Sequence, residues 1–391
     1  MKRGFAAYLL PVLLLSVSAC APGARRAAAP PAPPPMEYSE LCEAPGRCLI
    51  LSRLVLGTDH LGKMDNARTV EVLDEAVRLG INTFDTAPIY AQNIEARLGE
   101  WLKATGRTDL YVISKGGFPR DLGPGTYESR LKGSREEIAR NIQEEIDISD
   151  RQLNHSIAVY LLHRDDADFR DYARTDRPQT PVGVILSALA APELRRKYRL
   201  LGVSNWETPR IKEAQAQAAL DPGLPRPVLS SPYFSLLEMS ATTTHSGGAQ
   251  VKHAELMDQS FQEGIKLMPY SPLGGFSIVR RGWGAARREA LRLKREGDRY
   301  WGHAYDAIFH PANERRFKRA LKFAKRFNAE HGTAYTVDQV LNAYVLAHPR
   351  VSFLAIGPRD VDQLRKTVEA LRLAGQLTPA DLDYLYNDER P

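Results

Sequence analysis

The sequence predicts an α/β protein of the (β/α)8 TIM-barrel class, a single domain with long loops after several of its strands. Short apolar runs alternate with segments that carry apolar residues at helical spacing, a pattern typical of parallel strands joined by crossover helices. About eight such units fit into roughly 340 residues, which suits a closed barrel. The alternative is an open doubly wound sheet, but no Gly-x-Gly-x-x-Gly motif follows the first predicted strand.

The first element, residues 1–19, is expected to be an export signal rather than part of the fold. Lys2 and Arg3 give it a positive start, and residues 5–17 form an apolar run. This run is shorter than the about 20 residues that a membrane-spanning helix needs. Export through Sec or through a relaxed twin-arginine signal (Lys2-Arg3-Gly4-Phe5) both stay open.

The export signal ends at Val17-Ser18-Ala19-Cys20, which resembles a bacterial lipobox. We therefore predict a lipid on Cys20 and a protein tethered to the membrane on the periplasmic face of the cell envelope. Ala21 after the cysteine favours the outer membrane. The alternative is an ordinary signal peptide, in which Cys20 has no role.

Residues 20–40 are predicted to be a tether, because Ala and Pro dominate up to residue 35 and such a stretch cannot form a core. Residues 41–391 are then the barrel domain. Cys42 and Cys48 stand near its start. In an oxidising compartment they could form a disulfide, and two free thiols are the alternative.

The barrel pattern begins with a strand over residues 51–57 and a helix that starts at Asp65 and ends near Gly80. A later helix starts with Ser134 and Glu137 at capping-box spacing. Further strands are expected over 81–84, 110–114, 157–162, 200–203, 228–229, 265–268 and 351–356, and further helices over 94–104, 134–148, 182–198, 209–220, 250–264, 337–347 and 361–373.

Three longer segments, residues 116–133, 164–181 and 273–310, each follow a predicted strand. In a barrel they would lie on the face where active sites form. The net charge is +6, and the densest basic stretch, residues 280–299, also contains acidic residues. This mixture of charges is typical of a solvent-exposed helix face, so no nucleic-acid partner is expected.

Four polar residues stand at the ends of predicted strands. Asp85, Lys115 and His163 each follow a strand directly, and Tyr90 follows Asp85 by five residues. A barrel brings such strand ends to one rim. Each residue alone has a structural explanation, but together they suit carbonyl reduction: the phenol donates a proton, the ammonium eases its loss, the carboxylate holds the ammonium, and the imidazole orients the carbonyl.

These residues also resemble the aldo-keto reductase family. The matching blocks are Phe84-Asp85-Thr86-Ala87-Pro88-Ile89-Tyr90, Ile113-Ser114-Lys115-Gly116-Gly117 and Leu161-Leu162-His163-Arg164-Asp165-Asp166. The resemblance runs from about residue 51 to residue 373. It implies a catalytic tetrad with Tyr90 as general acid, Lys115 as the modulator of its pKa, Asp85 as the partner of Lys115, and His163 as the residue that orients the substrate.

The same resemblance implies an NADPH site. The block at residues 202–206 corresponds to contacts with the nicotinamide carboxamide, and the block at 270–273 to stacking on the nicotinamide ring. The block at 356–363 corresponds to contacts with the adenine ribose phosphate. Arg359 in this last block would pair with a 2′-phosphate, which favours NADPH over NADH. Ser231 stands near a position where the family usually has Gln, and Lys366 and Thr367 replace a Glu-Asn pair. The implied cofactor residues are Ser204, Asn205, Ser231, Tyr270, Ser271, Leu273, Gly357, Arg359 and Gln363.

The sequence is compatible with three functions. The sequence favours an NADPH-dependent reductase that converts an aldehyde or ketone, a small carbonyl substrate, to an alcohol. The alternative is a membrane-tethered barrel that binds the nucleotide as a sensor with little turnover. A metal-dependent hydrolase is the weakest, because only His163 stands beside carboxylates at a strand end and no metal-ligand triad is evident.

Overall fold

The computed structural model describes residues 33–240, 247–258 and 263–387. From Pro33 onward the chain forms one compact unit. The predicted export signal, the lipidation site at Cys20 and most of the predicted tether lie outside the described residues. Within the described ranges, no helix combines the length and the apolar character that crossing a bilayer requires.

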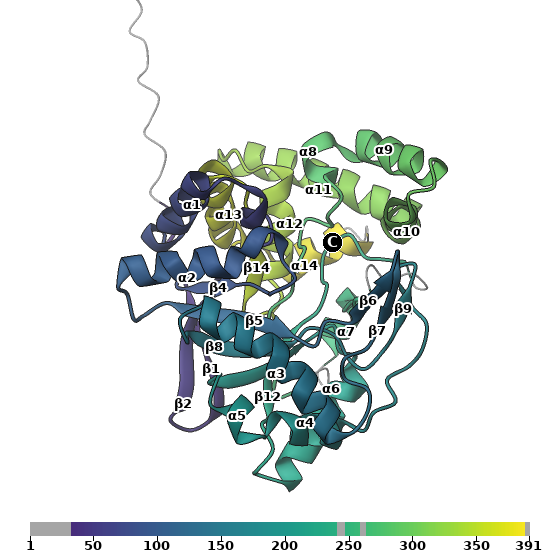
Figure 1. Cartoon of the computed structure of the whole chain (residues 1–391). Helices are drawn as coiled ribbons and strands as arrows, with labels where there is room; N and C mark the ends of the chain where they lie inside the picture. The colour runs from purple at the N-terminus through teal and green to yellow at the C-terminus, as the bar shows by residue number, and fades with distance from the viewer. Residues whose placement is uncertain (1–32, 241–246, 259–262, 388–391) are drawn as a thin grey trace, which may run out of the picture. The chain divides into compact units, whose positions relative to one another are not determined.

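An eight-stranded parallel sheet forms the centre of this unit (Figure 1). Its order is β13-β12-β11-β8-β5-β4-β3-β14. The two outer strands also meet, because the backbone N–H groups of Ser352 and Phe353 donate to the Leu267 carbonyl at 3.1 and 3.0 Å. The predicted α/β class with parallel strands is therefore confirmed. The strands are β3 (Leu54–Gly57), β4 (Thr83–Asp85), β5 (Tyr111–Gly116), β8 (Ile157–Leu162), β11 (Leu200–Ser204), β12 (Pro227–Ser231), β13 (Lys266–Leu267) and β14 (Leu354–Ile356).

Helices follow the strands as the apolar spacing predicts, and two predicted caps are present. The side chain of Asp65 accepts from the N–H of Arg68, and Ser134 and Glu137 form a capping box. These helices include α1 (Asn66–Arg78), α2 (Ile94–Thr105), α3 (Arg135–Gln152), α4 (Val182–Leu189), α5 (Pro192–Arg195), α6 (Thr208–Leu220), α7 (His253–Met257), α11 (Pro311–His331), α12 (Val337–Leu346), α13 (Val361–Ala374) and α14 (Pro379–Asn387).

Two predicted helices are shorter in the structure. The helix expected over 182–198 is divided into α4 and α5, because Ala191 is not helical and Pro192 has no N–H to continue the first helix. Of the helix expected over 250–264, the structure shows α7, and residues 259–262 lie outside the described ranges. Helices α11 and α14 were not predicted.

A hairpin precedes the parallel sheet and was not predicted. It consists of β1 (Tyr38–Ala44) and β2 (Arg47–Ser52), so residues 38–40, which were assigned to the predicted tether, belong to a strand. The strand expected over 51–57 is broken at Arg53. Leu41, Leu49 and Leu51 are buried against the side chains that fill the centre of the sheet. The hairpin therefore covers the end of the sheet where the parallel strands begin.

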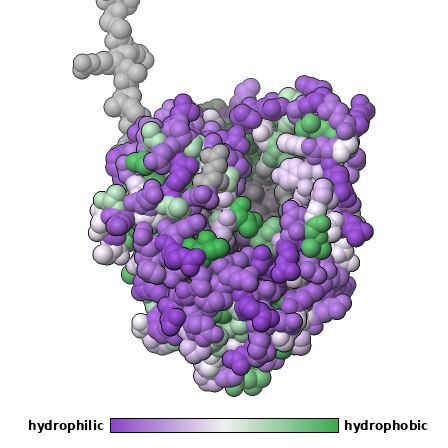
Figure 2. Space-filling view, viewed as in Figure 1, coloured by the Kyte–Doolittle hydropathy of each residue, from purple (hydrophilic) through white to green (hydrophobic). Residues whose placement is uncertain are grey.

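The three long segments, which were predicted as loops, contain strands and helices. The first two contribute β6 (Arg120–Gly123), β7 (Thr126–Glu128), β9 (Phe169–Arg170) and β10 (Ala173–Arg174), which pair as a four-stranded sheet. The third contains α8 (Ile278–Arg281), α9 (Trp283–Arg295) and α10 (Arg299–Ile308). Pairing between distant loops leaves no local periodicity, so sequence patterns did not reveal this sheet. Figure 2 shows the surface hollowed near α8–α10, with apolar side chains beside the hollow.

Candidate active site

The four predicted tetrad residues lie at the carboxyl end of the parallel sheet. Asp85 is the last residue of β4, Lys115 is in β5, and His163 follows β8 directly. The Lys115 ammonium lies 2.6 Å from Asp85 Oδ1 and donates to the Tyr90 hydroxyl at 3.0 Å. The Tyr90 and His163 rings meet edge to face, with centroids 6.2 Å apart. The structure therefore brings all four side chains together.

Lys115 is held by three oxygen atoms. Besides Asp85 and Tyr90, its ammonium donates to the backbone carbonyl of Thr86 at 2.8 Å. The side chains of Lys115 and Asp85 are only 4% and 8% exposed. Two hydrogen bonds and one ion pair thus give Lys115 a fixed position beside the phenol.

Burial governs the protonation of these groups. It raises the pKa of Tyr90 well above 10, and the nearby Asp85 raises it further. Burial also raises the pKa of Asp85 and lowers that of Lys115, whereas the attraction between the two opposes both shifts. Tyr90 therefore holds its proton at neutral pH, as a general acid must before it reacts.

His163 is neutral in this environment. Burial lowers its pKa well below 6.5, and the positive charges of Arg164 and Lys115 lower it further. Its backbone is fixed on both sides, because its N–H donates to the Gly116 carbonyl at 2.7 Å and its own carbonyl accepts from Asn205 Nδ2 at 3.1 Å. A neutral imidazole still has one N–H that can donate to a carbonyl oxygen.

Arg164 lies beside the tetrad and was not among the residues that the sequence analysis predicted for the site. It is buried, donates to the His163 carbonyl at 2.7 Å, and lies over the Phe118 ring at 5.1 Å. Its charge acts on both Tyr90 and Tyr270. Its position in the sequence could have pointed to it, because Arg164 directly follows His163 at the end of a buried strand, and charged side chains are uncommon at buried positions.

Four predicted cofactor residues form a second hydrogen-bonded group next to His163. Asn205, in a left-handed conformation with φ 62°, donates to Ser204 Oγ at 2.9 Å. Ser204 Oγ donates to the Ser231 carbonyl at 2.9 Å, and the Tyr270 hydroxyl donates to Asn205 Oδ1 at 2.7 Å. The structure thus joins β11, β12 and the segment after β13 at one edge of the tetrad.

The remaining predicted cofactor residues follow β13 and β14. Ser271 is exposed and Leu273 is half-buried. Gly357 and Arg359 are exposed just before α13, whose first turn contains Gln363. The Gln363 side chain accepts from the backbone N–H of Arg359 at 3.0 Å. A helix N-terminus with a nearby guanidinium is a suitable place for a phosphate group.

Aromatic side chains connect the tetrad with all three long segments. Phe118 meets the His163 ring at 5.2 Å and the Phe169 ring at 6.1 Å between centroids. The contacts continue through Tyr127 to Tyr172, which meets Tyr300 at 5.4 Å. These rings form an apolar wall that extends outward from His163.

In the described ranges, one cluster has the spacing of metal ligands: Glu40, Cys42 and Cys48. The two cysteine sulfurs are bonded to each other at 2.04 Å, so neither is a free thiolate that could bind a metal. Of the two states that the sequence left open for Cys42 and Cys48, the structure shows the disulfide, and it lies in the hairpin rather than at the tetrad.

Comparison with known protein families matches residues 53–387 to the family described as "Aldo/keto reductase family". The chain belongs to the aldo/keto reductase family. This family has the (β/α)8-barrel architecture, which agrees with the eight parallel strands and their helices. Aldo/keto reductases generally use NAD(P)H, and several relatives of this chain are oxidoreductases by name, which supports carbonyl reduction as its general chemistry.

Several curated aldo/keto reductase relatives cover most of the chain. An "Uncharacterized oxidoreductase YrpG" of Bacillus subtilis is 28% identical over 87% of this chain and 92% of its own length. An "Aryl-alcohol dehydrogenase [NADP(+)]" of Phanerodontia chrysosporium is 24% identical over 89% and 85%. A "6-dehydroglucose reductase" of Agrobacterium fabrum is 24% identical over 83% and 90%. The similarity therefore extends across the whole domain of this aldo/keto reductase.

Proposed function

We propose that this aldo/keto reductase is an NADPH-dependent enzyme that reduces an aldehyde or ketone to an alcohol, with Tyr90 as the proton donor. The observation that carries the proposal is the chain of contacts from Asp85 through Lys115 to the Tyr90 hydroxyl, at 2.6 and 3.0 Å. Such a chain places a protonated phenol beside a fixed cation, which is what protonation of a developing alkoxide needs.

Each tetrad side chain has one task in this proposal. Tyr90 gives its hydroxyl proton to the carbonyl oxygen as negative charge develops there. Lys115 stabilises the resulting phenolate, and Asp85 keeps Lys115 charged in a buried site. His163, as a neutral imidazole, donates a hydrogen bond that orients the carbonyl. The aromatic wall from Phe118 to Tyr172 favours substrates with an apolar or ring-shaped body.

The residues present fit a bound NADPH. Ser204, Asn205 and Ser231 would hold the carboxamide end and Tyr270 would lie against the nicotinamide ring, with Ser271 and Leu273 beside them. Arg359 and the start of α13 would hold the 2′-phosphate, because a guanidinium and a helix N-terminus both favour a phosphate. Bound NADPH supplies the hydride to the carbonyl carbon. The name of the fungal relative, which includes NADP(+), supports this preference.

A turnover assay with a panel of aliphatic, aromatic and sugar aldehydes tests the proposal. Consumption of NADPH that depends on the aldehyde, and that is slower with NADH, is the expected result. Arg359→Gln should reduce the preference for NADPH over NADH without abolishing turnover. Turnover that requires an added metal ion, or none with any carbonyl, would contradict the proposal.

A second function is a nucleotide-binding sensor with little turnover. The observation that favours it is the set of hydrogen bonds to Asn205 Oδ1. This oxygen already accepts from the Tyr270 hydroxyl at 2.7 Å and from the Ala249 N–H at 3.2 Å, so a carboxamide would have to compete for it. The same assay separates the two: saturable NADPH binding with no turnover on the whole panel would favour the sensor.

We also propose that the protein is anchored by a lipid on Cys20 to the bacterial envelope, on the periplasmic face of the outer membrane. The support is the apolar run and the Val17-Ser18-Ala19-Cys20 sequence. Mass spectrometry of the N-terminal peptide should show a lipid on Cys20, and Cys20→Ser should release the protein from the membrane fraction. A soluble protein that keeps residues 1–19 would contradict this location.

A further inference from the structure

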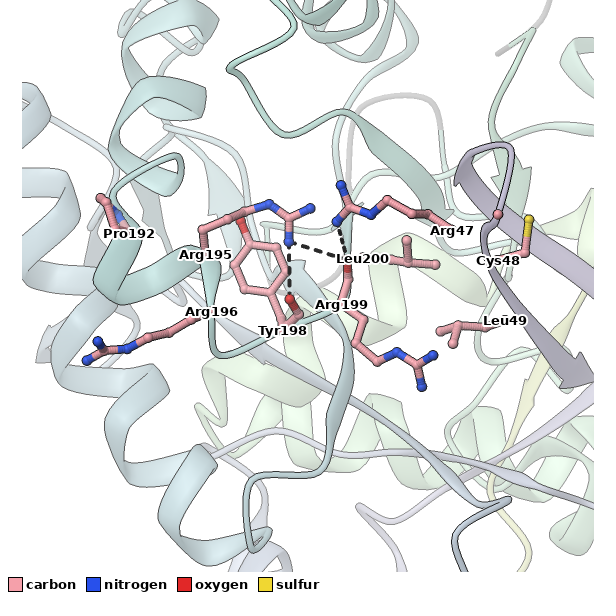
Figure 3. Close-up of a pocket in the computed structure, with 10 residues that line it drawn as sticks. Arg47, Cys48, Leu49, Pro192, Arg195, Arg196, Tyr198, Arg199 and Leu200 are labelled. Atoms are coloured by element: carbon pink, nitrogen blue, oxygen red, sulfur yellow. Dashed lines mark hydrogen bonds between the residues drawn. The ribbon is translucent and has the colours of Figure 1, made fainter.

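A pocket lies at the opposite end of the sheet from Tyr90, where the parallel strands begin. It has a volume of about 620 Å³ and lies between the turn of the β1–β2 hairpin and the segment from α5 to β11 (Figure 3). Its lining contains four arginines, Arg47, Arg195, Arg196 and Arg199, and no acidic residue. Pockets for neutral ligands are mostly apolar, so this lining indicates an anion.

One carboxylate lies next to these arginines. Glu43, whose side chain is 11% exposed, forms ion pairs with Arg47 at 2.8 Å and with Arg195 at 3.0 Å. Arg196 and Arg199 are exposed and form no ion pair within the part of the chain that the structure describes. Four guanidinium groups and one carboxylate leave a local charge of about three positive units.

Two of the four arginines, Arg47 and Arg195, are held in place by backbone carbonyls. Arg195 donates to the carbonyls of Tyr198 and Arg199 at 3.2 and 3.4 Å, and Arg47 donates to the Arg199 carbonyl at 3.4 Å. Figure 3 shows both guanidinium groups turned toward this carbonyl. The site therefore has positioned cations before any ligand arrives, which reduces the entropic cost of binding.

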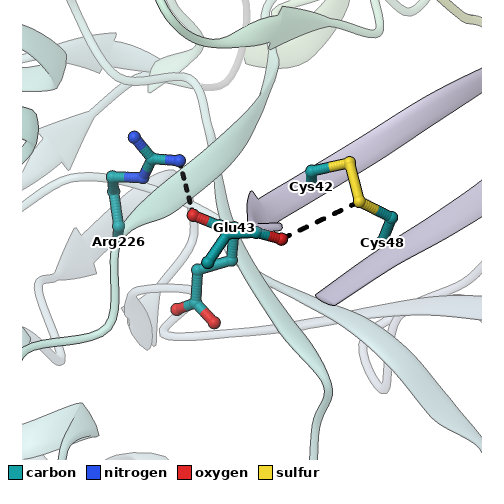
Figure 4. The surroundings of a disulfide bond; sticks show 5 residues. Cys42, Glu43, Cys48 and Arg226 are labelled. Carbon is teal, nitrogen blue, oxygen red and sulfur yellow. Dashed lines mark hydrogen bonds between the residues drawn. A yellow bond between two sulfur atoms is a disulfide. The ribbon is translucent and has the colours of Figure 1, made fainter. Parts of the chain in front are cut away.

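The disulfide fixes the hairpin turn that carries Arg47. Cys42 and Cys48 are bonded on either side of it, and Arg226 donates to the Glu43 carbonyl at 2.6 Å (Figure 4). These two connections tie the turn to itself and to the segment before β12. Arg47 and Glu43 thus belong to a fixed part of the hairpin rather than to a free loop.

We propose that this arginine pocket binds a phosphate-bearing ligand, either a soluble diphosphate compound or the phosphate headgroup of an anionic lipid. Guanidinium groups match phosphate oxygens in pairs, and a local charge near three suits a ligand with more than one negative charge. The pocket is at the end of the sheet away from the tetrad, so binding there would leave the active site open. The proposal does not depend on the proposed reductase activity.

The test compares the full chain with two double variants of equal charge change. Arg196→Gln/Arg199→Gln alters the pocket through its two exposed arginines. Arg288→Gln/Arg295→Gln on α9 is the matched control, because these arginines are also exposed and do not line the arginine pocket. Binding is measured by calorimetry with inorganic pyrophosphate, and by sedimentation with phosphatidylglycerol and phosphatidylcholine vesicles.

We expect pyrophosphate to bind at millimolar concentration or below, with an at least tenfold loss in the pocket variant and little change in the control variant. If only phosphatidylglycerol vesicles bind, and the pocket variant loses that binding, the ligand is a lipid headgroup. Absence of both kinds of binding, or an equal loss in both double variants, would overturn the proposal. Aldehyde turnover by the pocket variant should match that of the unaltered protein.

Discussion

At the carboxyl end of the parallel sheet, Lys115 and Asp85 are 4% and 8% exposed and form one ion pair. At the amino end, Arg196 and Arg199 are exposed and have no carboxylate partner in the described ranges. Buried charges are costly unless paired, and their pairing fixes geometry and protonation, which chemistry requires. Exposed charges cost little and remain available to a ligand. The same sheet thus holds a buried, paired set of charges at the end proposed for the reaction and exposed charges at the end proposed for ligand binding.

The largest expected effect is the loss of the buried ion pair at the carboxyl end of the sheet. Lys115→Met leaves Asp85 buried without its partner, so the free energy of unfolding at pH 7 should fall by about 3–5 kcal/mol. Carbonyl reduction should fall by a factor of about 10² to 10⁴, because Tyr90 loses the cation beside it. Urea unfolding and the aldehyde assay measure the two effects.

Lys132→Met is the control for an ion pair near the surface. Lys132 is about one third exposed and pairs with Asp168 at 2.6 Å and Asp176 at 3.0 Å. Its loss should lower the free energy of unfolding by less than about 1 kcal/mol. If the two lysine variants were destabilised equally, burial would not distinguish the two kinds of charge.

A smaller effect is expected from the hairpin at the other end. Cys42→Ser/Cys48→Ser removes the cross-link that closes a short loop. Because the unfolded chain then has more conformational entropy, the free energy of unfolding should fall by about 2 kcal/mol. Because the hairpin lies away from the tetrad, kcat should not change. Thermal unfolding and steady-state kinetics test this separation, and a parallel loss of kcat would show that the two ends are coupled.

The smallest expected effect concerns pH. Since burial and neighbouring cations lower the pKa of His163 well below 6.5, its ring stays neutral when the pH falls from 8 to 6. The high pKa of Tyr90 keeps the phenol protonated over the same range. The profile of kcat/KM should therefore have no step near the ordinary histidine pKa of about 6.5. A step there that disappears in His163→Gln would show that His163 titrates in the working enzyme.

The sequence predicted the tetrad because each of its residues lies at or near a strand end, and strand ends are visible as the termination of an apolar run. Predicting that Asp85, Lys115 and His163 lie together required no tertiary contact other than the pairing of parallel strands in the sheet. The predicted cofactor residues came from a resemblance to known blocks. The structure places three of them, Ser204, Asn205 and Tyr270, in one hydrogen-bonded group.

Other features could not be predicted because they depend on contacts between distant segments. The β6–β7–β9–β10 sheet joins loops about 40 residues apart, and its strands are too short to show alternation. The position of Arg164 beside the tetrad depends on its burial against the Phe118 ring, a contact that the sequence does not show. The arginine pocket joins residue 47 to residues 195–199, so each arginine alone looked like an ordinary surface cation.

The most direct test of the central claim separates cofactor binding from proton donation in Tyr90→Phe. NADPH is titrated into both proteins by intrinsic fluorescence, and a single turnover with a reactive aldehyde is then followed by absorbance. The account predicts equal NADPH affinity and a rate in the variant that is lower by about 10² to 10⁴. An equal rate in both proteins would show that Tyr90 is not the proton donor.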